Sequence, residues 1–347
     1  MSRIYLDHNA TTPLRPEARE AMLRAMDAVG NPSSVHAEGR TSKAIIEKAR
    51  AQISDALGAS GADIVFTASA TEAAALACAG RSLHGSLIEH DAVGAWIDPV
   101  LAADTDGRIH VETPVASCLQ MANSETGVVQ DVPKGLALSD MTQAFGKLPF
   151  GFDWVGVEMG LISGHKLGGP KGVGALILRQ GLDVPAQVRG GGQEMGRRSG
   201  TENVVGIAGF GAAAEAAQRD VASGKWDRVE KLRNILENAL AAASKTTIFV
   251  GKDSKRLPNT SCFITPGWKG ETQVMQMDLS GFAISAGSAC SSGKVKASRV
   301  LKAMGYSELE AASAVRVSLG LETTDEDVLR FADVWAQKLR KHEARAA

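Results

Sequence analysis

The segment from Met159 to Gly172 most constrains how this chain can fold. It opens with an apolar run typical of a buried strand, turns through Ser-Gly, and presents His165 and Lys166 ahead of a glycine-rich stretch. A second apolar run, Val173 to Leu178, then resumes the strand pattern. A lysine at the tip of such a strand–turn–strand unit can be buried, and a buried amine becomes a nucleophile toward carbonyls. Taken alone, the pattern also fits a solvated loop lysine.

The bulk composition excludes several classes of function. The chain has 347 residues, 44% hydrophobic and 22% charged, which suits roughly two globular domains. Its net charge of −1 gives no reason to expect nucleic acid or an anionic membrane as a partner. No apolar run approaches the ~20 residues that a membrane helix needs. The N-terminus has no apolar signal core, so we expect a cytoplasmic protein.

The four cysteines fall into two kinds. None lies close to another in the sequence, so the spacing predicts no metal site. Cys78, Cys118 and Cys262 have apolar neighbours and are expected in the core as thiols. Cys290 instead stands in a small, polar setting, Ser-Ala-Gly-Ser-Ala-Cys-Ser-Ser-Gly-Lys, where nearby lysines favour a thiolate.

Strand and helix patterns alternate as far as Leu178, which predicts a mostly parallel sheet covered by helices. If Leu119–Ala122 and Leu136–Ser139 are parallel neighbours, the short link Val129–Ala137 leaves no room for a full crossover helix. Beyond residue 222 the pattern becomes α+β. We therefore predict a large domain over residues 14–221 and a small domain formed by residues 1–13 and 222–347, the small domain carrying the Cys290 loop.

An aldehyde cofactor such as pyridoxal 5'-phosphate (PLP) bound to Lys166 would need three kinds of partner. Its phosphate requires backbone N–H groups at a helix start, and Ala70-Thr71 begins a helix directly after a strand. Its ring nitrogen requires a carboxylate, for which Asp140 at a strand end is the candidate. Its ring face requires a flat partner, and His90 follows another strand of the same sheet. Singly, these features also fit an ordinary N-cap, a turn aspartate and a loop histidine.

Longer motifs support the same interpretation together. In chain order they are Tyr-Leu-Asp-His-Asn-Ala-Thr-Thr-Pro (5–13), Gly-Asn-Pro-Ser-Ser-Val-His (30–36), Ser-Ala-Thr-Glu (69–72), Asn-Ser-Glu-Thr-Gly-Val-Val-Gln (123–130), Asp-Met-Thr-Gln-Ala-Phe-Gly-Lys (140–147), Ser-Gly-His-Lys (163–166), Gly-Gly-Gly-Gln-Glu (190–194), Arg-Arg-Ser-Gly-Thr (197–201) and Ser-Ala-Gly-Ser-Ala-Cys (285–290). Over residues 5 to about 320 the chain thus resembles the cysteine desulfurases (NifS/IscS-like) of the class V aminotransferase family, which are fold-type I PLP enzymes.

The resemblance implies a fold, an activity and partners. The fold is that of the PLP-dependent transferases (aspartate aminotransferase-like): a mostly parallel seven-stranded-type sheet with helices on both faces, plus a smaller α+β domain. The activity is conversion of L-cysteine to L-alanine with a persulfide left on Cys290. That sulfur would pass to an acceptor protein, with iron–sulfur cluster assembly the expected destination. The expected assembly is a homodimer.

Individual roles carry over by the same resemblance. Lys166 would form the Schiff base with PLP, His90 would stack on the ring and move protons, and Cys290 would be the nucleophile. The implied cofactor-binding residues are Ala70, Thr71, His90, Ser124, Asp140, Gln143, Ser163, His165, Lys166 and, from the second subunit, Thr201. The implied substrate-binding residues are Asn9, Asn31 and Arg316, with Arg316 clamping the carboxylate.

The chain departs from the family pattern at several places. Ser124 replaces an asparagine that touches the ring hydroxyl, the Val129–Ala137 link is short, residues 101–118 are trimmed, and Leu167-Gly168 and Leu321 replace more usual residues. Two alternatives therefore stay open: a selenocysteine lyase or other class V aminotransferase-type enzyme, and a degenerate, non-catalytic scaffold for sulfur transfer. The joint presence of Lys166 and Cys290 with their expected partners argues against the scaffold.

Overall fold

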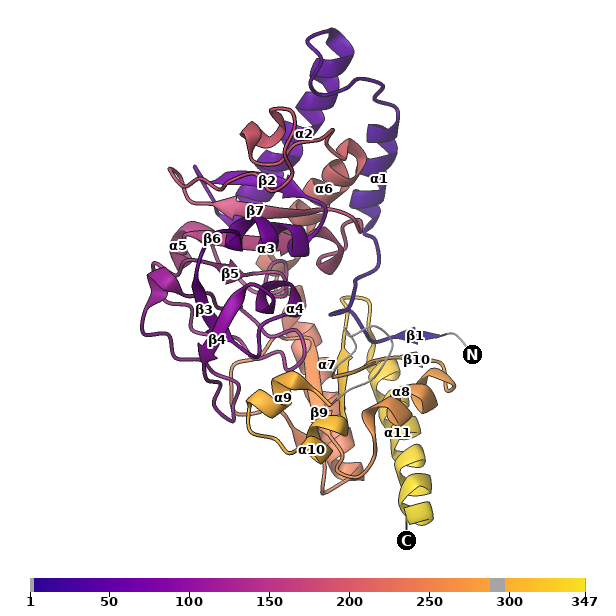
Figure 1. The fold of residues 1–347 in the computed structure, drawn as a ribbon. Helices are drawn as coiled ribbons and strands as arrows, with labels where there is room; N and C mark the ends of the chain where they lie inside the picture. The colour runs from indigo at the N-terminus through magenta and orange to yellow at the C-terminus, as the bar shows by residue number, and fades with distance from the viewer. Residues whose placement is uncertain (1–2, 288–296, 347) are drawn as a thin grey trace.

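The computed structural model describes residues 3–287 and 297–346, so Cys290 and its loop lie outside the described residues. Figure 1 shows an upper body built around β2, β7, β6 and β5, and a lower body around β9 with the long helices α7 and α11. The N-terminal strand β1 (Ile4–Tyr5) lies with the lower body, beside β10 (Phe282–Ala283). Within the described residues, none of the helices combines the length and apolar character needed to cross a bilayer.

The upper body contains the predicted sheet. Its hydrogen-bonded order is β2 (Asp63–Thr67), β7 (Gly174–Leu178), β6 (Met159–Ser163) and β5 (Ser139–Asp140). Parallel bridges from Leu138 to Cys118 and from Ser117 to His84 continue it to β3 (Leu83–Ser86) and β4 (Ile97–Leu101). Seven segments therefore lie side by side, and β7 alone among them runs antiparallel to its neighbours. The mostly parallel seven-stranded architecture is confirmed.

The predicted strand–turn–strand unit around Lys166 is confirmed. Its two strands, β6 and β7, lie inside the sheet rather than at an edge. β6 and β7 are buried along their whole length, as expected of central strands covered on both faces. The 3₁₀ turn η2 (Gly164–Lys166) joins the end of β6 to the loop that leads into β7. The register pairs Ser163 with Gly174, which fixes the end of the hairpin nearest the lysine.

Helices cover both faces of the sheet, again as predicted. Alternate strand residues such as Ile64 and Ile177 pack in one apolar cluster with α1 (Pro16–Met26), α2 (Ala37–Leu57) and α6 (Val204–Ala222). The residues between them, such as Val65 and Leu176, pack against α3 (Ala70–Cys78) on the opposite face. The shorter helical elements of this body are α4 (Asp91–Gly94), η1 (Pro114–Ala116), α5 (Phe152–Val155) and η3 (Gln193–Gly196).

The short link before β5 also follows the prediction. Cys118 and Leu138 are parallel neighbours, and residues 129–137 contain no helix. Turn hydrogen bonds hold the link instead, from Gly135 N to Gly156 O (2.7 Å) and from Ala137 N to Pro114 O (2.9 Å). One detail was wrong: the strand predicted at Leu119–Ala122 is present only as isolated bridges and backbone hydrogen bonds. The apolar run at this position correctly predicted buried residues, but it did not predict whether they pair as a regular strand.

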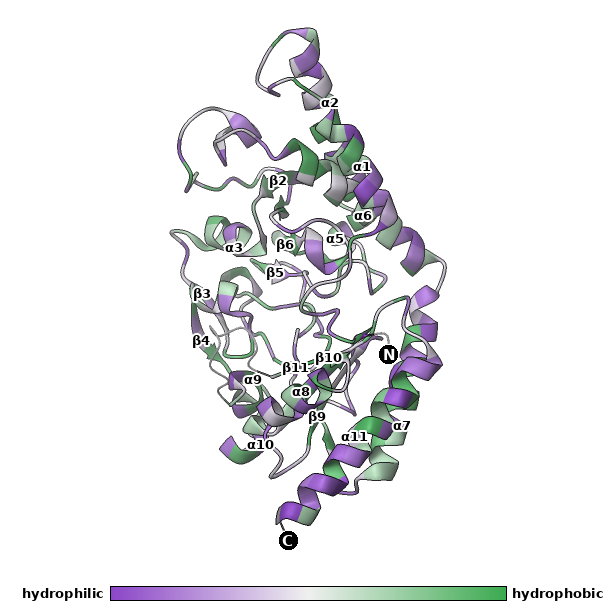
Figure 2. Ribbon diagram, turned by 90° about the vertical axis from the view of Figure 1, so that its right-hand side faces the viewer, coloured by the Kyte–Doolittle hydropathy of each residue, from purple (hydrophilic) through white to green (hydrophobic). Residues whose placement is uncertain are grey.

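The lower body is the predicted α+β part. Its antiparallel sheet has the order β11 (Ser285–Ala286), β12 (Ala314–Ser318), β9 (Thr260–Ile264) and β8 (Ile248–Phe249). The helices are α7 (Lys225–Ala243), α8 (Gly270–Asp278), α9 (Arg299–Ala303), α10 (Glu308–Ala312) and α11 (Asp325–Ala346). Figure 2 shows α7 and α11 side by side with mixed apolar and polar residues. Trp335 of α11 packs edge-on against Phe263 and at a tilt against Trp268 in the core of this body. The exact domain boundaries at residues 13/14 and 221/222 stay a prediction.

Candidate active site

Lys166 lies against the N-terminal segment of the chain. Its Nζ donates hydrogen bonds to the carbonyl oxygens of Asn9 (2.7 Å) and Ala10 (2.9 Å). Two further bonds fasten the same segment to the turn, from Thr12 N to His165 O (2.9 Å) and from Thr12 Oγ1 to Lys166 O (3.3 Å). The amine is therefore held at the tip of the β6–β7 hairpin by a segment more than 150 residues away in sequence.

The start of α3 lies beside the same hairpin end. Ser69 caps the helix by accepting a hydrogen bond from Glu72 N (3.2 Å), while the amides of Ala70 and Thr71 have no carbonyl in the preceding turn to bind. Gly174, opposite Ser163, approaches the start of α3 so closely that an added Cβ would lie 2.6 Å from Ser69 C and 2.8 Å from Ala70 N. Helix amides and the buried Ser163 hydroxyl therefore converge, an arrangement that suits a phosphate group.

His165 adds a neutral imidazole to this end of the site. Its Nδ1 lies 3.2 Å from Thr11 Oγ1. Burial, followed by the charges of Lys166 and Lys171, lowers the pKa of His165 to about 4. The ring is therefore uncharged at neutral pH, so it can hydrogen-bond an anion without competing with Lys166 for a proton.

Asp140 and His90 lie at the ends of parallel strands of the same sheet. β5 ends at Asp140, whose Oδ1 accepts a hydrogen bond from Thr142 N (2.9 Å). His90 follows β3 and caps α4, its Nδ1 accepting from Ala92 N (3.1 Å). The C-terminal ends of parallel strands share one edge of a sheet, so β3, β5 and β6 bring both residues to the edge that carries Lys166.

Glu89, directly before His90, is a buried carboxyl that the sequence motifs did not predict. Its Oε1 accepts a hydrogen bond from Gln120 N (2.7 Å), and its Oε2 has no partner among the described residues. Burial raises the pKa of Glu89 to about 8, and the Asp140 carboxylate raises it further against the lowering effect of the Gln120 bond. Glu89 therefore holds a proton at neutral pH, close to the predicted ring site.

Gln143 lies one turn beyond Asp140 and is part of a buried polar cluster. Its Nε2 donates to Asn9 O (3.0 Å), and its Oε1 accepts from Lys147 Nζ (2.8 Å). Lys147 is the last residue of the Asp-Met-Thr-Gln-Ala-Phe-Gly-Lys motif, and the sequence predicted no role for it. Its spacing of four residues from Gln143 is the signal that could have revealed the contact.

Asn9 is the centre of this cluster rather than an open binding group. Its Oδ1 accepts from Asn259 Nδ2 (3.1 Å), and its Nδ2 donates to Thr260 Oγ1 (2.8 Å) and Ser124 O (3.1 Å). The side chain is buried and its hydrogen-bonding capacity is spent on the protein. This favours an organising role for Asn9 over the direct substrate contact that the resemblance implied.

Arg316 lies on β12, where it faces the same cluster. Its Nη1 donates to Ser124 O (3.1 Å) and its Nη2 to Asp7 Oδ1 (2.7 Å), while its buried Nε has no partner among the described residues. The main chain at Ser124 thus joins Arg316 to Asn9. The guanidinium lies within the same group of residues as Gln143 and Lys166, as a carboxylate clamp requires.

Three predicted residues are exposed at the surface of this chain. Asn31 lies in the loop before α2, its Oδ1 accepting from Ser33 N (2.9 Å), and Thr201 lies just before α6. Thr71, in the first turn of α3, is also exposed. The prediction that Thr201 reaches a partner subunit's site is untested and stays a prediction.

The described cysteines behave as core residues. Cys78, Cys118 and Cys262 are buried free thiols, as expected. Burial raises the pKa of each of them, to about 11 for Cys78, so none is a ready nucleophile at neutral pH. Among the described residues, no three His, Cys, Asp or Glu side chains are grouped to share a metal ion.

The residues present fit PLP. The test rests on three observations: the α3 start closed against Gly174 gives an anion cradle, Asp140 ends the strand next to the lysine, and Gln143 directs an amide into the same region. Lys166 is the amine available for a covalent bond to an aldehyde. The groups come from adjacent strand ends, so one small planar ligand could contact them all.

Comparison with known proteins agrees with this site. The family model described as aminotransferase class-V matches residues 4–93 and 103–331. The chain is 38% identical to a cysteine desulfurase of Cereibacter sphaeroides, covering 96% of this chain and 95% of that protein. It is 34% identical to the cysteine desulfurase IscS of Dictyoglomus turgidum, covering 97% and 95%. The crystal structure of a NifS-like protein from Rickettsia africae superimposes with a TM-score of 0.89 at 32% identity, over 97% of this chain and 99% of that one.

These matches extend over almost the whole chain, and the structural match agrees with the fold described above. They also confirm the resemblance on which the site residues were predicted. The chain belongs to the class V aminotransferase family and, within it, to the cysteine desulfurases.

Proposed function

We propose that this protein is a PLP-dependent cysteine desulfurase that converts L-cysteine to L-alanine and passes the sulfur to an acceptor protein. The observation that supports this best is the position of Lys166, held between an anion cradle and a ring-binding carboxylate on a scaffold shared with its relatives. When bound, the cofactor supplies an electron-withdrawing ring that labilises bonds at the substrate's carbon atoms. Lys166 provides the covalent attachment.

The other site residues have separable tasks in this proposal. Arg316 binds the substrate carboxylate through its guanidinium, whose buried Nε has no hydrogen-bond partner among the described residues. Asp140 pairs with the ring nitrogen, and Gln143 meets the ring hydroxyl beside the shorter Ser124. His90 stacks on the ring and holds or moves a proton. Ser163, His165 and the first amides of α3 bind the phosphate, with Thr201 of a second subunit completing the site in a homodimer.

Cys290 completes the reaction. Its thiolate attacks the substrate sulfur, the C–S bond breaks, and a proton replaces sulfur on the departing carbon. One L-cysteine and the Cys290 thiol thus yield one L-alanine and a Cys290 persulfide, so atoms and electrons balance. Acceptors in iron–sulfur cluster assembly are the expected destination, because one relative carries the name IscS.

The test is an assay of the purified protein with PLP. We expect a visible absorbance band, and with L-cysteine and a thiol reductant equal amounts of alanine and sulfide. Cys290→Ala should bind PLP normally and lose sulfide release, with Cys262→Ala as the control because that thiol is buried in the core. A protein that binds no PLP would be the non-catalytic scaffold. Much faster turnover of L-selenocysteine, persisting in Cys290→Ala, would favour a selenocysteine lyase.

A further inference from the structure

Lys147 is a buried cation without a carboxylate partner among the described residues. Its side chain is 4% exposed, and its Nζ donates to Gln143 Oε1 (2.8 Å), Gln143 O (3.3 Å) and Asn9 Oδ1 (3.5 Å). All three acceptors are neutral oxygens. Burying a charge without an opposite charge is costly, so a lysine in such a place needs an explanation beyond stability.

The charged groups that face Lys147 make the arrangement costlier. Burial, then the charges of Lys166 and Arg316, lowers the pKa of Lys147 to about 7. His8 is the other titratable neighbour, and burial together with Lys147 lowers its pKa to about 4, so it stays neutral. The buried Lys147, the half-buried Lys166 and the Arg316 guanidinium therefore gather around one cluster, and no acid among the described residues offsets the charge on Lys147.

The contact with Lys147 determines which way the Gln143 amide faces. A lysine ammonium only donates hydrogen bonds, so the Gln143 atom that faces it must be the oxygen. The amide nitrogen therefore points the other way, where one of its hydrogens binds Asn9 O (3.0 Å) and the second is left for another acceptor. Asn9 O also accepts from Lys166 Nζ (2.7 Å), so the three side chains share one network.

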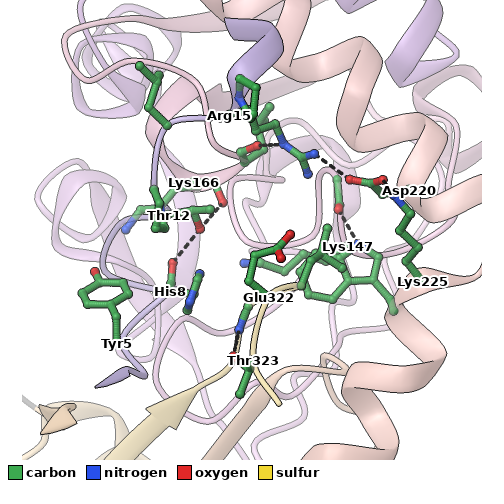
Figure 3. Close-up of a pocket in the computed structure, with 18 of the residues that line it drawn as sticks. Tyr5, His8, Thr12, Arg15, Lys147, Lys166, Asp220, Lys225, Glu322 and Thr323 are labelled. Carbon is green, nitrogen blue, oxygen red and sulfur yellow. Dashed lines mark hydrogen bonds and ion pairs between the residues drawn. The ribbon is translucent and has the colours of Figure 1, made fainter. Parts of the chain in front are cut away.

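Lys147 also has a route to solvent, through a cavity that Gln143 does not line. A cavity of about 810 Å³ between the two bodies is lined by both Lys147 and Lys166, together with Tyr5, His8, Thr12 and Trp226. Figure 3 shows Lys147 and Lys166 among the residues around this cavity, together with Asp220 and Lys225. Gln143 and Asp140 do not line it. Lys147 can therefore exchange protons through the cavity while contacting the predicted cofactor site.

We propose that Lys147 is a positioning residue for the reaction: it fixes Gln143 with its amide nitrogen toward the ring hydroxyl of the cofactor, and it places a second positive charge beside Lys166. This inference rests on the proposed function. The charge disfavours protonation of the Lys166 nitrogen, so that nitrogen gives up its proton at lower pH than it would beside a neutral residue.

The test compares Lys147→Met with Lys147→Gln in the PLP-loaded protein. Lys147→Met removes both the charge and the donor, so the midpoint of the pH titration of the visible band should rise by about one pH unit. The same variant should bind PLP about tenfold more weakly, because Gln143 is no longer oriented. Lys147→Gln keeps a donor without the charge. It should restore affinity in part but keep the raised midpoint.

Lys225→Met is the matched control. Lys225 lines the same cavity, but its Nζ is paired with the Asp220 carboxylate (2.6 Å), whereas the acceptors of Lys147 are neutral oxygens. Removing this amine should leave the titration midpoint and the PLP affinity unchanged. An equal shift of the titration midpoint in both variants would mean that a positive charge anywhere in the cavity has this effect. The specific role of Lys147 would then be rejected.

A second readout uses the protein without cofactor. A lysine whose pKa falls from its usual 10.5 to about 7 on folding costs no stability above its unfolded pKa, and the cost grows as pH falls toward 7. The difference in melting temperature, Lys147→Met minus wild type, should therefore increase as pH is lowered from 10 to 7. A variant with an unmoved band and a pH-independent loss of melting temperature would show a merely structural lysine. Absence of a band in the wild type would instead reject the proposed function along with this inference.

Discussion

The two ends of the candidate site are built in different ways. The phosphate end uses α3, β6 and β7, which are neighbours in one sheet and its covering layer. The ring and substrate end joins Asn9 to Ser124 across 115 residues, Asn9 to Asn259 across 250, and Arg316 to Asp7 across 309. The first end depends on strand register, whereas the second depends on the two bodies meeting around the N-terminal segment. Lys166 lies where both ends meet, so substitutions on either side should have different signatures.

The largest effect is expected at the residue shared by both ends. Lys166→Ala removes the covalent attachment, so alanine formation should fall on the order of 10⁴-fold. The visible band of the bound cofactor should change as well. Lys171→Ala is the matched control, because this exposed lysine follows in the same loop. If Lys166→Ala kept near-normal turnover, Lys147, which lines the same cavity, would have to be tested as the attachment point.

At the substrate end, Arg316→Gln should lower kcat/KM for L-cysteine about 10²- to 10³-fold, mainly through KM. The same change leaves Asp7 without its cationic partner, so stability should also fall. The double variant with Asp7→Asn separates the two effects. It should recover melting temperature without recovering KM; recovery of both would show that Arg316 only holds Asp7 in place.

A third prediction concerns Glu125, a buried carboxyl directly after Ser124, whose carbonyl oxygen accepts hydrogen bonds from Asn9 and Arg316. Burial raises the pKa of this carboxyl from 4.5 to about 7, against the hydrogen bond from Ser298 and the charge of Arg316. An acid whose pKa rises on folding keeps its full stability contribution below the unfolded pKa and loses it as pH rises toward the folded one. The free energy of unfolding of the wild type should therefore fall by about 2 kcal/mol between pH 5 and 8 because of this carboxyl group.

Glu125→Gln should remove that loss, because an amide does not titrate. The measurement is the urea midpoint of both proteins at several pH values between 5 and 8. The difference should grow in favour of the variant up to about pH 7 and then level off. A constant difference across the range would contradict the raised pKa. Glu158→Gln is a suitable control, because its pairing with Arg179 lies near the surface.

The contrast between the ends also explains what the sequence could predict. The strands around Lys166, the helix start at Ala70 and the acid at Asp140 follow from local patterns and from motif order. The place of Asn9 in the polar cluster with Gln143 and Lys147 could not be found in this way, because its hydrogen bonds to them join segments that only tertiary packing brings together. The motifs contain all three members and implied roles for Asn9 and Gln143, but they did not show that the three side chains form one network. Glu89 was visible beside His90, yet nothing in the local pattern showed that it would be buried.

The smallest effect is expected at the phosphate end, from Gly174→Ala. The new Cβ would lie 2.6 Å from Ser69 C, so the start of α3 must shift away from β7, at a cost of about 1–2 kcal/mol. Because that shift moves the amides of Ala70 and Thr71, PLP should bind about tenfold more weakly while KM for L-cysteine changes little. Gly151→Ala is the control, since its Cβ would meet Trp154 Cβ at an ordinary 3.7 Å. If Gly174→Ala raised KM as strongly as Arg316→Gln, the phosphate end and the substrate end would not be independent of each other. The contrast between them would then be rejected.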